Sequence, residues 1–341
     1  MKAMVLESLS CFESNQQPLK LLQLPIPVPN SQQIQIKIAS CGVCHTDLDA
    51  IEGRSLPASL PIVPGHQVIG HISRLGHDVK GFKLGDRVGV AWIFSACGHC
   101  QFCLAGNENL CPNFQGTGRD VNGGYAQYMT VDHRFAFAMP KQFSDLQAAP
   151  LLCAGAVGFR ALRLTGLKNG QYLGLTGFGA SAHLLLKMVK RLLPNSEIYV
   201  FTRSESERQF ALSLGANWAG SHAELAPNKP DCIIDTTPSW EPVLAALAQL
   251  QSGGRLVINA LSKHHQPASL GRLNYQAHLW REKEIKTVAN VTRSDVRAFL
   301  ELAVDLAIEP DLEVFNLEQA NQALCQLANG QTRGAKVLQI N

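Results

Sequence analysis

The chain has 341 residues, of which 46% are hydrophobic and 17% charged, so it is long enough for two globular domains and too apolar for a disordered protein. Its net charge of +3 is spread along the sequence without a dense Lys/Arg run, which argues against nucleic acid or an anionic membrane as the main partner. The start lacks the pattern of a signal peptide, and the longest apolar run (148–159) is shorter than the ~20 residues of a membrane helix. We therefore expect a cytoplasmic protein.

The first 140 residues have the pattern of a β-rich domain. Apolar residues alternate with polar ones at 33–40, 67–76, 86–92 and 125–132, and turns rich in Gly, Pro and Asp separate these runs. The pattern predicts a barrel-like or sandwich-like domain. A helical pattern follows from Asp145 to Gly166.

One loop of this domain contains four closely spaced cysteines: Cys97, Cys100, Cys103 and Cys111. Disulfide frameworks occur mainly in small secreted domains that lack a core, so this spacing in a long chain favours a metal. Four thiolates complete the tetrahedral shell of zinc and leave no position for substrate, which predicts a structural zinc. The alternatives are free or redox-paired cysteines, or an iron–sulfur cluster, whose usual spacings differ.

Strands and helices alternate in the second half of the chain. Strands are expected at 171–177, 197–203, 231–237, 253–261 and 284–290, with helices at 181–193, 206–216 and 239–251. This alternation predicts a parallel sheet with helices on both faces. The remainder, from Val291 on, contains a further helix and short strands and is expected to return to the first domain.

A glycine-rich turn follows the first strand of this second half. Gly177, Gly179 and Ala182 form the pattern G-x-G-x-x-A between an expected strand and an expected helix. Glycines there permit a tight turn and close approach of a pyrophosphate, and the helix start offers free N–H groups. The pattern predicts a dinucleotide site; the alternative is a glycine turn that binds no ligand.

The end of the second strand indicates which dinucleotide binds. NAD sites usually place an acidic residue at this tip, whereas here Thr202, Arg203 and Ser204 follow the strand. A guanidinium and two hydroxyls suit a 2′-phosphate, so we expect NADP(H). The alternative is that Arg203 stacks on the adenine and that NAD(H) also binds, with Glu205 close by in the sequence.

Three further stretches carry a family resemblance: CGVCHTDLDA (41–50), VPGHQVIG (63–70) and LLCAG (151–155). Together with the cysteine loop and the glycine turn, they resemble the zinc-dependent alcohol dehydrogenases of the medium-chain dehydrogenase/reductase superfamily, over nearly the whole chain. The resemblance implies an α/β fold with a β-rich GroES-like catalytic domain (1–155 and 290–341) and a doubly wound, parallel-sheet Rossmann domain (156–289). It also implies a homodimer or homotetramer built through the nucleotide-binding domains.

The resemblance further implies a catalytic zinc held by Cys44, His66 and Cys153. Cys44, not Cys41, matches the family ligand, because it directly precedes a basic and a hydroxyl residue. Two thiolates and one imidazole leave the fourth zinc position open, as catalysis requires. With the cysteine loop, this gives two zinc ions per chain.

The same resemblance assigns roles to residues around this zinc. Thr46 would contact the substrate oxygen and relay its proton, and His45 would lie near the cofactor pyrophosphate. Asp47 would orient His66 from behind, a common arrangement for metal-binding histidines. Lys336 falls where the family has a late basic residue near the phosphates; the alternative is a solvated surface lysine.

Two residues depart from the family pattern. Gln67 replaces the usual Glu after the zinc histidine, which removes a negative charge near the metal. Asp49 stands where the family has a terminal relay histidine, and a carboxylate has a lower reference pKa, so we expect an altered proton route.

Trp92 matches a pocket-lining aromatic residue, with an ordinary core tryptophan as the alternative.

Three other functions were weighed. A zinc-independent quinone or enone reductase of the same superfamily would lack both sets of zinc ligands. A non-catalytic zinc-binding protein on nucleic acid would need positive charge near the cysteine loop, which has little. A binding protein that keeps the fold without catalysis would not need Thr46 and three intact ligands. The sequence therefore predicts an alcohol dehydrogenase or aldehyde reductase acting on a small alcohol or aldehyde.

Overall fold

The computed structural model describes residues 1–263, 267–331 and 333–340, and the chain forms two compact units. Unit 1 comprises Met1–Ala156, Val291–Asp305 and Glu309–Asn341. Unit 2 comprises Val157–Asn290 and Leu306–Ile308. The chain therefore leaves unit 1 and returns to it near its end.

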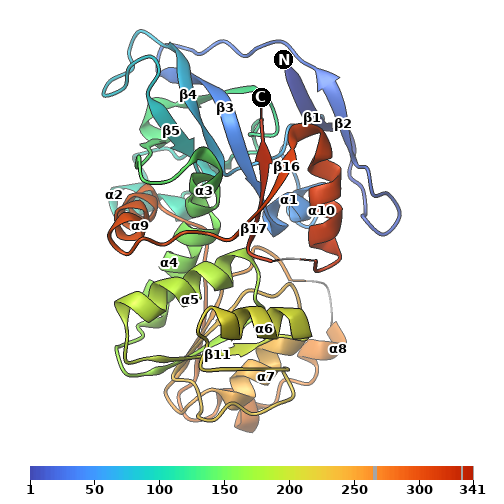
Figure 1. Cartoon of the computed structure of the whole chain (residues 1–341), viewed down its shortest axis with the longest axis vertical. Coiled ribbons are helices and arrows are strands. Elements are labelled where there is room, and N and C mark those ends of the chain that lie inside the picture. Colours follow the sequence, from blue (N-terminus) through green and yellow to red (C-terminus); the bar gives the residue numbers. More distant parts are fainter. Residues whose placement is uncertain (264–266, 332, 341) are drawn as a thin grey trace. The chain divides into compact units, whose positions relative to one another are not determined.

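Unit 1 contains a seven-stranded, mostly antiparallel sheet. Its order is β16 (Leu312–Asn316), β17 (Ala335–Gln339), β3 (Gln33–Val43), β4 (Val68–Leu75), β5 (Arg87–Val90) and β9 (Ala136–Ala138), and β8 (Tyr128–Asp132) also pairs with β3. β17, near the end of the chain, pairs antiparallel with the end of β3, as the red and blue strands of Figure 1 show. The last strand thus supports the segment that leads into Cys44.

Smaller elements complete unit 1. Two short hairpin-like sheets pair β1 (Lys2–Leu6) with β2 (Leu19–Gln23), and β6 (Ile93–Ser95) with β7 (Gln115–Gly116). The helices are α1 (His45–Ile51), α2 (Gln101–Leu104), α3 (Asp145–Ala148), α9 (Arg293–Asp305) and α10 (Ala320–Ala328), with short helices η1 (Glu108–Leu110), η2 (His133–Phe135), η3 (Ala149–Leu152) and η5 (Leu317–Gln319). Alternating Ile34, Ile36 and Ile38 of β3 are all buried, which is the pattern that the sequence indicated.

The segment after Asp145 is not the continuous helix that the sequence pattern predicts. It divides into α3, the tighter helix η3, and α4 (Ala154–Thr165), with Cys153 between the last two in a non-helical conformation (φ −128°, ψ −72°). Pro150 lies within η3, where its missing backbone N–H removes a helical hydrogen bond. The expectation of one helix is therefore wrong, and the break falls at a predicted zinc ligand.

The same stretch, Asp145–Thr165, is the one candidate for a membrane span among the described residues, by length and composition alone. Of its most apolar window, 72% is buried inside the protein. Burial of this kind is typical of the core helix of a soluble protein.

Unit 2 contains a six-stranded, fully parallel sheet. Its order is β12 (Trp218–Gly220), β11 (Glu197–Phe201), β10 (Tyr172–Thr176), β13 (Cys232–Asp235), β14 (Arg255–Ile258) and β15 (Glu284–Thr287). In chain order this is 3-2-1-4-5-6, the order of dinucleotide-binding sheets. The predicted doubly wound sheet is confirmed; β12 was not predicted, because three residues are too few to show a pattern.

Helices pack against this sheet and fix its strands. They are α5 (Ala180–Leu192), α6 (Glu205–Ser213), α7 (Glu241–Gln249), α8 (Pro267–Leu270) and the π-helix η4 (Tyr275–Leu279). Val243 and Leu247 of α7 are buried in one apolar cluster with Ile233, Leu256 and Ile258 of β13 and β14. Each such side chain contributes about 1.5–3 kcal/mol by leaving water, so the strand ends that face the glycine turn are firmly held.

Candidate active site

The structure brings Cys44, His66 and Cys153 together within unit 1. Their possible ligand atoms all lie within 4.8 Å of one another, and Cys44 Sγ is 3.2 Å from His66 Nε2. Tetrahedral zinc, with Zn–S and Zn–N bonds of ~2.3 and ~2.0 Å, would separate a sulfur from a nitrogen ligand by about 3.5 Å. The donor set and its spacing therefore fit a zinc ion after a small adjustment.

Three separate elements supply these ligands. Cys44 directly follows β3 and caps α1, where its sulfur accepts a hydrogen bond from Thr46 N at 3.4 Å. His66 lies just before β4, and Cys153 occupies the break between η3 and α4. Each ligand thus stands at the end of a regular element, where the backbone is held and the side chain is free to turn inward.

Asp47 fixes the orientation of the His66 imidazole. Its Oδ1 accepts a hydrogen bond from His66 Nδ1 at 3.0 Å, which leaves Nε2 directed toward the Cys44 sulfur. Asp47 is buried and also accepts from the backbone N–H groups of Cys44 and Gly65, at 3.0 and 3.2 Å. This is the carboxylate–histidine arrangement that supports metal ligation.

Two of the three ligands, Cys44 and His66, have raised pKa values. The hydrogen bond with Cys153 and burial raise the pKa of the Cys44 thiol well above its ordinary value. Burial lowers the pKa of His66, but Cys44 and Asp47 together outweigh this effect and raise it well above its usual range. Protons therefore bind tightly to these two groups, and a divalent cation would have to displace them, as is usual when thiolate sites bind zinc.

The other predicted residues of this region lie on α1 and directly before β4. Thr46 is half-buried in the first turn of α1. Asp49 is buried, and its carboxylate accepts a hydrogen bond from Arg54 Nε at 2.6 Å, so the group proposed as a proton acceptor already has a cationic partner. Gln67 is buried and packs closely against β3. A Cβ atom added at Gly42 of β3 would lie only 2.7 Å from the Gln67 Cδ atom.

Trp92 is a buried side chain of unit 1. Its ring lies 5.1 Å from that of Phe114, and the Arg119 guanidinium lies 4.9 Å from the ring centre. Its indole Nε1 has no hydrogen-bond partner among the described residues. Trp92 is thus packed as a core residue, with one donor unused.

The four-cysteine loop forms a compact cluster. All four sulfurs lie within 4.8 Å of one another, and those of Cys97 and Cys103 are 3.9 Å apart, close to the ~3.8 Å between two sulfurs on tetrahedral zinc. Backbone N–H groups of His99 and Cys100 lower the pKa of the Cys97 thiol to about 6, whereas burial raises the pKa of the neighbouring Cys103 thiol to about 12. All ten cysteines of the chain are free, which excludes paired cysteines as the arrangement in this structure.

The glycine turn of unit 2 has the geometry of a phosphate cradle. Gly177 has φ +77°, a conformation that other residues rarely adopt, and its N–H donates to Phe201 O at 2.9 Å. Gly179 begins α5, and a Cβ placed there would meet nothing within 4 Å, so the space in front of the helix is open. Ala182 is fully buried, as the third small residue of the pattern should be where helix and strand pack closely.

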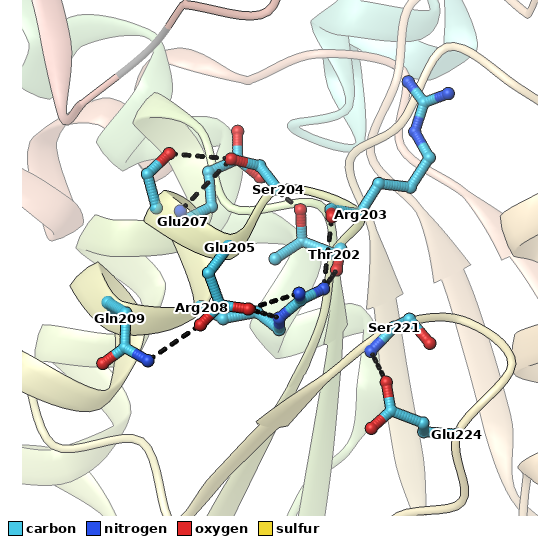
Figure 2. A network of polar contacts seen from close by, with 10 residues as sticks. Thr202, Arg203, Ser204, Glu205, Glu207, Arg208, Gln209, Ser221 and Glu224 are labelled. Atoms are coloured by element: carbon cyan, nitrogen blue, oxygen red, sulfur yellow. Dashed lines mark hydrogen bonds and ion pairs between the residues drawn. The ribbon is translucent and has the colours of Figure 1, made fainter.

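The tip of β11 differs from the sequence-based expectation (Figure 2). The expectation that no acid lies there is wrong, because Glu207 folds back and its carboxylate accepts a hydrogen bond from the Thr202 hydroxyl. The Arg203 side chain is exposed and extends away from this network. The Ser204 hydroxyl caps α6. Burial raises the pKa of Glu207, while the charge of Arg203 lowers it.

Glu205, the acid that the sequence suggested as a link to NAD(H), is turned away from the tip. Its exposed carboxylate accepts hydrogen bonds from Arg208 and Gln209. Arg208 in turn donates to the carbonyl oxygens of Thr202 and Arg203, at 3.0 and 3.2 Å. The acid beside Thr202 is therefore Glu207, whereas Glu205 forms hydrogen bonds with other side chains of α6.

Sequence reasoning missed a buried polar cluster at the ends of β10 and β13. Asp235 is fully buried, accepts hydrogen bonds from the Thr176 and Thr237 hydroxyls at 2.6 and 2.7 Å, and pairs with Lys263. An acidic residue directly after a buried strand, followed by two threonines, was the available signal. Sequence reasoning also missed Tyr125, whose hydroxyl donates to Asp47 Oδ2 at 3.0 Å.

Lys336 is not a surface lysine, so that alternative is wrong. It is 2% exposed on β17, where its ammonium contacts the Glu313 carboxylate and donates to Gln326 Oε1 at 2.7 Å. The Phe315 ring lies 5.2 Å away. Its charge is therefore balanced inside unit 1, and a contact with cofactor phosphate remains a prediction.

Comparison with known proteins agrees with this geometry. The family of alcohol dehydrogenase GroES-like domains matches residues 30–141. A probable alcohol dehydrogenase of Mycobacterium tuberculosis is 41% identical over 329 residues, covering 95% of this chain and 93% of that protein. An alcohol dehydrogenase of Geobacillus stearothermophilus is 30% identical, with complete coverage of both chains.

Solved structures give the same result for the fold. A cinnamyl alcohol dehydrogenase of Sorghum bicolor is similar with a TM-score of 0.82 and 28% identity, covering 94% of each chain. The alcohol dehydrogenase of the archaeon Aeropyrum pernix has a TM-score of 0.87 at 23% identity and covers 99% of this chain and 100% of its own. With the two cysteine-containing clusters and the 3-2-1-4-5-6 sheet, these similarities establish that the chain belongs to the zinc-type alcohol dehydrogenase family of the medium-chain dehydrogenase/reductase superfamily.

Proposed function

We propose that this protein is a zinc-dependent alcohol dehydrogenase or aldehyde reductase that transfers a hydride between a small alcohol and NADP(H), with NAD(H) as the weaker cofactor. The observation that carries the proposal is the convergence of Cys44, His66 and Cys153 within 4.8 Å. Relatives named alcohol dehydrogenases, up to 41% identical over nearly the whole chain, support it.

The chain would supply two zinc sites with different chemistry. Cys97, Cys100, Cys103 and Cys111 would hold a structural ion with no open position. Cys44, His66 and Cys153 would hold a zinc whose Lewis acidity lowers the pKa of an alcohol or polarises a carbonyl. The second site has only three protein ligands, which is the count that leaves room for substrate.

Protein groups around the second site would manage orientation and protons. Thr46 stands two residues after Cys44, on the helix that Cys44 caps, and its hydroxyl would receive and relay the proton of the substrate oxygen. Asp47 holds His66 in one orientation. Asp49, paired with Arg54, would act as an acceptor only if that ion pair opened, so the onward route of the proton would differ from a histidine relay.

The cofactor proposal rests on the tip of β11. Arg203 is exposed and, among the described residues, makes no ion pair, so its guanidinium is available to a 2′-phosphate. Ser204 and Thr202 lie on either side of it. Glu207 opposes the phosphate by its charge, which is why NAD(H) is retained as a second cofactor in this proposal.

A substrate panel measured with both cofactors tests the function. Primary aliphatic, allylic and benzylic alcohols and their aldehydes would be assayed with NADP(H) and NAD(H). The proposal predicts turnover of several members, abolished by a zinc chelator and restored by zinc, with higher kcat/KM for NADPH than for NADH. Absence of turnover in a protein that contains both zincs would contradict it.

We further propose that the protein forms a homodimer through the edge of the unit 2 sheet. β15 is an edge strand, and all four of its residues are exposed, including Ile285 at 44%. Tyr275 and Trp280, at 57% and 49% exposure, precede it. An exposed edge strand has unpaired backbone groups and is a place where a second copy can add its own strand across a two-fold axis.

We also propose a cytoplasmic location. Ten free cysteines, four of them gathered in one loop, suit a reducing compartment, where thiols persist and can bind metal. Fractionation of cells that produce the protein would test this location.

A further inference from the structure

Tyr125 lies directly behind the turn that carries His66. It is fully buried, and its backbone N–H donates to Pro64 O at 2.9 Å. The preceding Gly124 N–H donates to Gly65 O, also at 2.9 Å. The segment before β8 is thus paired, residue by residue, with the segment that ends at the metal ligand.

The Tyr125 ring packs against the same turn. Gly65 has φ +96°, and a Cβ placed on it would lie 2.4 Å from Tyr125 Cδ1, so only glycine allows the ring to approach so closely. A phenylalanine ring would occupy this space equally well. The tyrosine hydroxyl therefore adds a polar group to a fully buried position, which costs free energy unless it is hydrogen-bonded.

That hydroxyl completes the hydrogen bonding of Asp47. Oδ2 of Asp47 accepts from Tyr125 OH and from Cys44 N, both at 3.0 Å. Oδ1 accepts from His66 Nδ1 at 3.0 Å and from Gly65 N at 3.2 Å. A carboxylate offers about four lone-pair positions, so all of them are used, and the carboxylate plane is fixed from four sides.

The four donors are not equivalent. Two are backbone groups of the turn and of the α1 start, and one is the imidazole that would bind the metal. Tyr125 is the other side chain among them; it is not a candidate metal ligand, and it comes from a segment 78 residues away in sequence. Its hydroxyl prevents the carboxylate from rotating about its own axis while the other three bonds hold its position.

We propose that Tyr125 is a positioning residue of the metal site, whose hydroxyl locks the Asp47 carboxylate and through it the His66 imidazole. This inference rests on the proposed zinc-dependent function. Loss of the hydroxyl leaves the ring packing intact but frees one carboxylate oxygen, so His66 is held less firmly toward the ion. Changes in such outer partners typically alter metal affinity by about 10–100-fold.

The test compares Tyr125→Phe with Tyr128→Phe, a control on β8 three residues away and only half-buried. We measure the rate at which each zinc passes to a chelator, the visible spectrum after cobalt replaces the catalytic zinc, and kcat and KM. Tyr125→Phe is expected to release one zinc about 10-fold faster, with shifted cobalt bands and lower kcat, while the four-cysteine zinc leaves at the parent rate. Tyr128→Phe should match the parent.

A double-mutant cycle with Asp47→Asn shows whether the hydroxyl acts through Asp47. If it does, Tyr125→Phe has little further effect on zinc release in the Asp47→Asn background. Unchanged zinc release and cobalt spectrum in Tyr125→Phe, or effects of the two substitutions that simply multiply, would overturn the inference. Retention of the four-cysteine zinc reports that the variant is folded.

The same measurements separate this inference from the proposed function. A parent protein that binds no second zinc would overturn both. A parent with two zincs and full activity, together with a Tyr125→Phe variant that behaves identically, would overturn the role of Tyr125 alone.

Discussion

The buried charged side chains Asp235 and Lys336 each have several polar partners, whereas the half-buried Glu207 has one hydrogen bond among the described residues. Asp235 has two hydroxyl donors and a lysine, and Lys336 has a carboxylate and an amide. Glu207 receives one hydrogen bond, from Thr202, so burial raises its pKa although Arg203 carries a compensating charge nearby. Of the two acidic side chains near the β11 tip, Glu207 is therefore protonated more easily than Glu205.

Glu207→Gln should raise kcat/KM for NADPH about 10-fold, which corresponds to the loss of ~1.4 kcal/mol of repulsion, and leave NADH little changed. In the parent, the carboxylate is negative above its raised pKa and neutral below it. The preference for NADPH over NADH should therefore increase as pH falls through that pKa, and Glu207→Gln should remove this pH dependence. Glu205→Gln is the control, since Glu205 faces Arg208. A lower NADPH preference in Glu207→Gln would contradict the assignment.

Arg203→Ala should have the opposite effect. Loss of the exposed guanidinium removes the cation proposed for the 2′-phosphate, so kcat/KM for NADPH should fall by about 10-fold or more, as for one lost charged contact, with NADH nearly unaffected. Arg208→Ala would not test this role, because Arg208 donates hydrogen bonds to the backbone carbonyl oxygens of Thr202 and Arg203. An equal loss of kcat/KM with both cofactors would show that Arg203 does not bind the 2′-phosphate.

At the scale of elements, the four-cysteine loop is connected to α9 by a partly buried ion pair. Glu108, in η1 between the third and fourth cysteines, accepts hydrogen bonds from Arg293 N and Nε at 3.0 and 2.9 Å. Arg293 begins α9, and its guanidinium also lies 4.8 Å from the centre of the Phe135 ring. The loop is therefore attached to the body of unit 1 by a contact independent of its metal.

Glu108→Gln should lower the free energy of unfolding by about 2 kcal/mol, a value typical of hydrogen bonds to a charged group. Urea denaturation of the zinc-loaded protein measures it. Glu318→Gln breaks an exposed pair with Lys2 in the same unit and should cost roughly 0–1 kcal/mol. Equal effects of the two substitutions would show that the loop does not depend on Arg293.

Much of the fold could be predicted from the sequence, because its elements have strong periodicity. The alternating isoleucines of β3 and the strand–glycine–helix pattern around Gly177 were sufficient for the two main sheets. The break at Cys153 had one signal in the sequence, Pro150, since a proline inside a helical pattern often ends or kinks the helix, although the apolar composition of 145–166 continues through it. The strands β16 and β17 were expected only as short strands, and their place in the sheet was not predicted. That place depends on the pairing of β17 with β3, which lies some 300 residues earlier in the sequence.

The metal ligands of the candidate site could be predicted from the sequence, but the residues that hold those ligands in place could not. Cys44, His66 and Cys153 were assigned by family resemblance, and the structure places them together. The Asp47–Tyr125 hydrogen bond joins residues 78 apart, and nothing in local pattern connects them. The return of Glu207 to Thr202 depends on the first turn of α6, where a side chain three residues past the cap reaches back to the strand end.

For the whole molecule, the edge of the unit 2 sheet predicts the oligomeric state. If two copies pair through β15, Ile285→Lys places a charge in that contact and should yield a monomer by sedimentation. Leu225→Lys, at a 79% exposed position elsewhere in unit 2, should leave the parent assembly intact. A parent that sediments as a monomer, or an Ile285→Lys variant that remains a dimer, would contradict this interface.

The central claim is that Cys44, His66 and Cys153 hold a catalytic zinc distinct from the four-cysteine zinc. The most direct measurement is zinc content per chain, determined with hydride-transfer activity, for the parent and for Cys153→Ala. We predict two zincs and turnover in the parent, and one zinc with no turnover in Cys153→Ala. A single zinc in an active parent, with Cys153→Ala retaining full activity, would contradict the account.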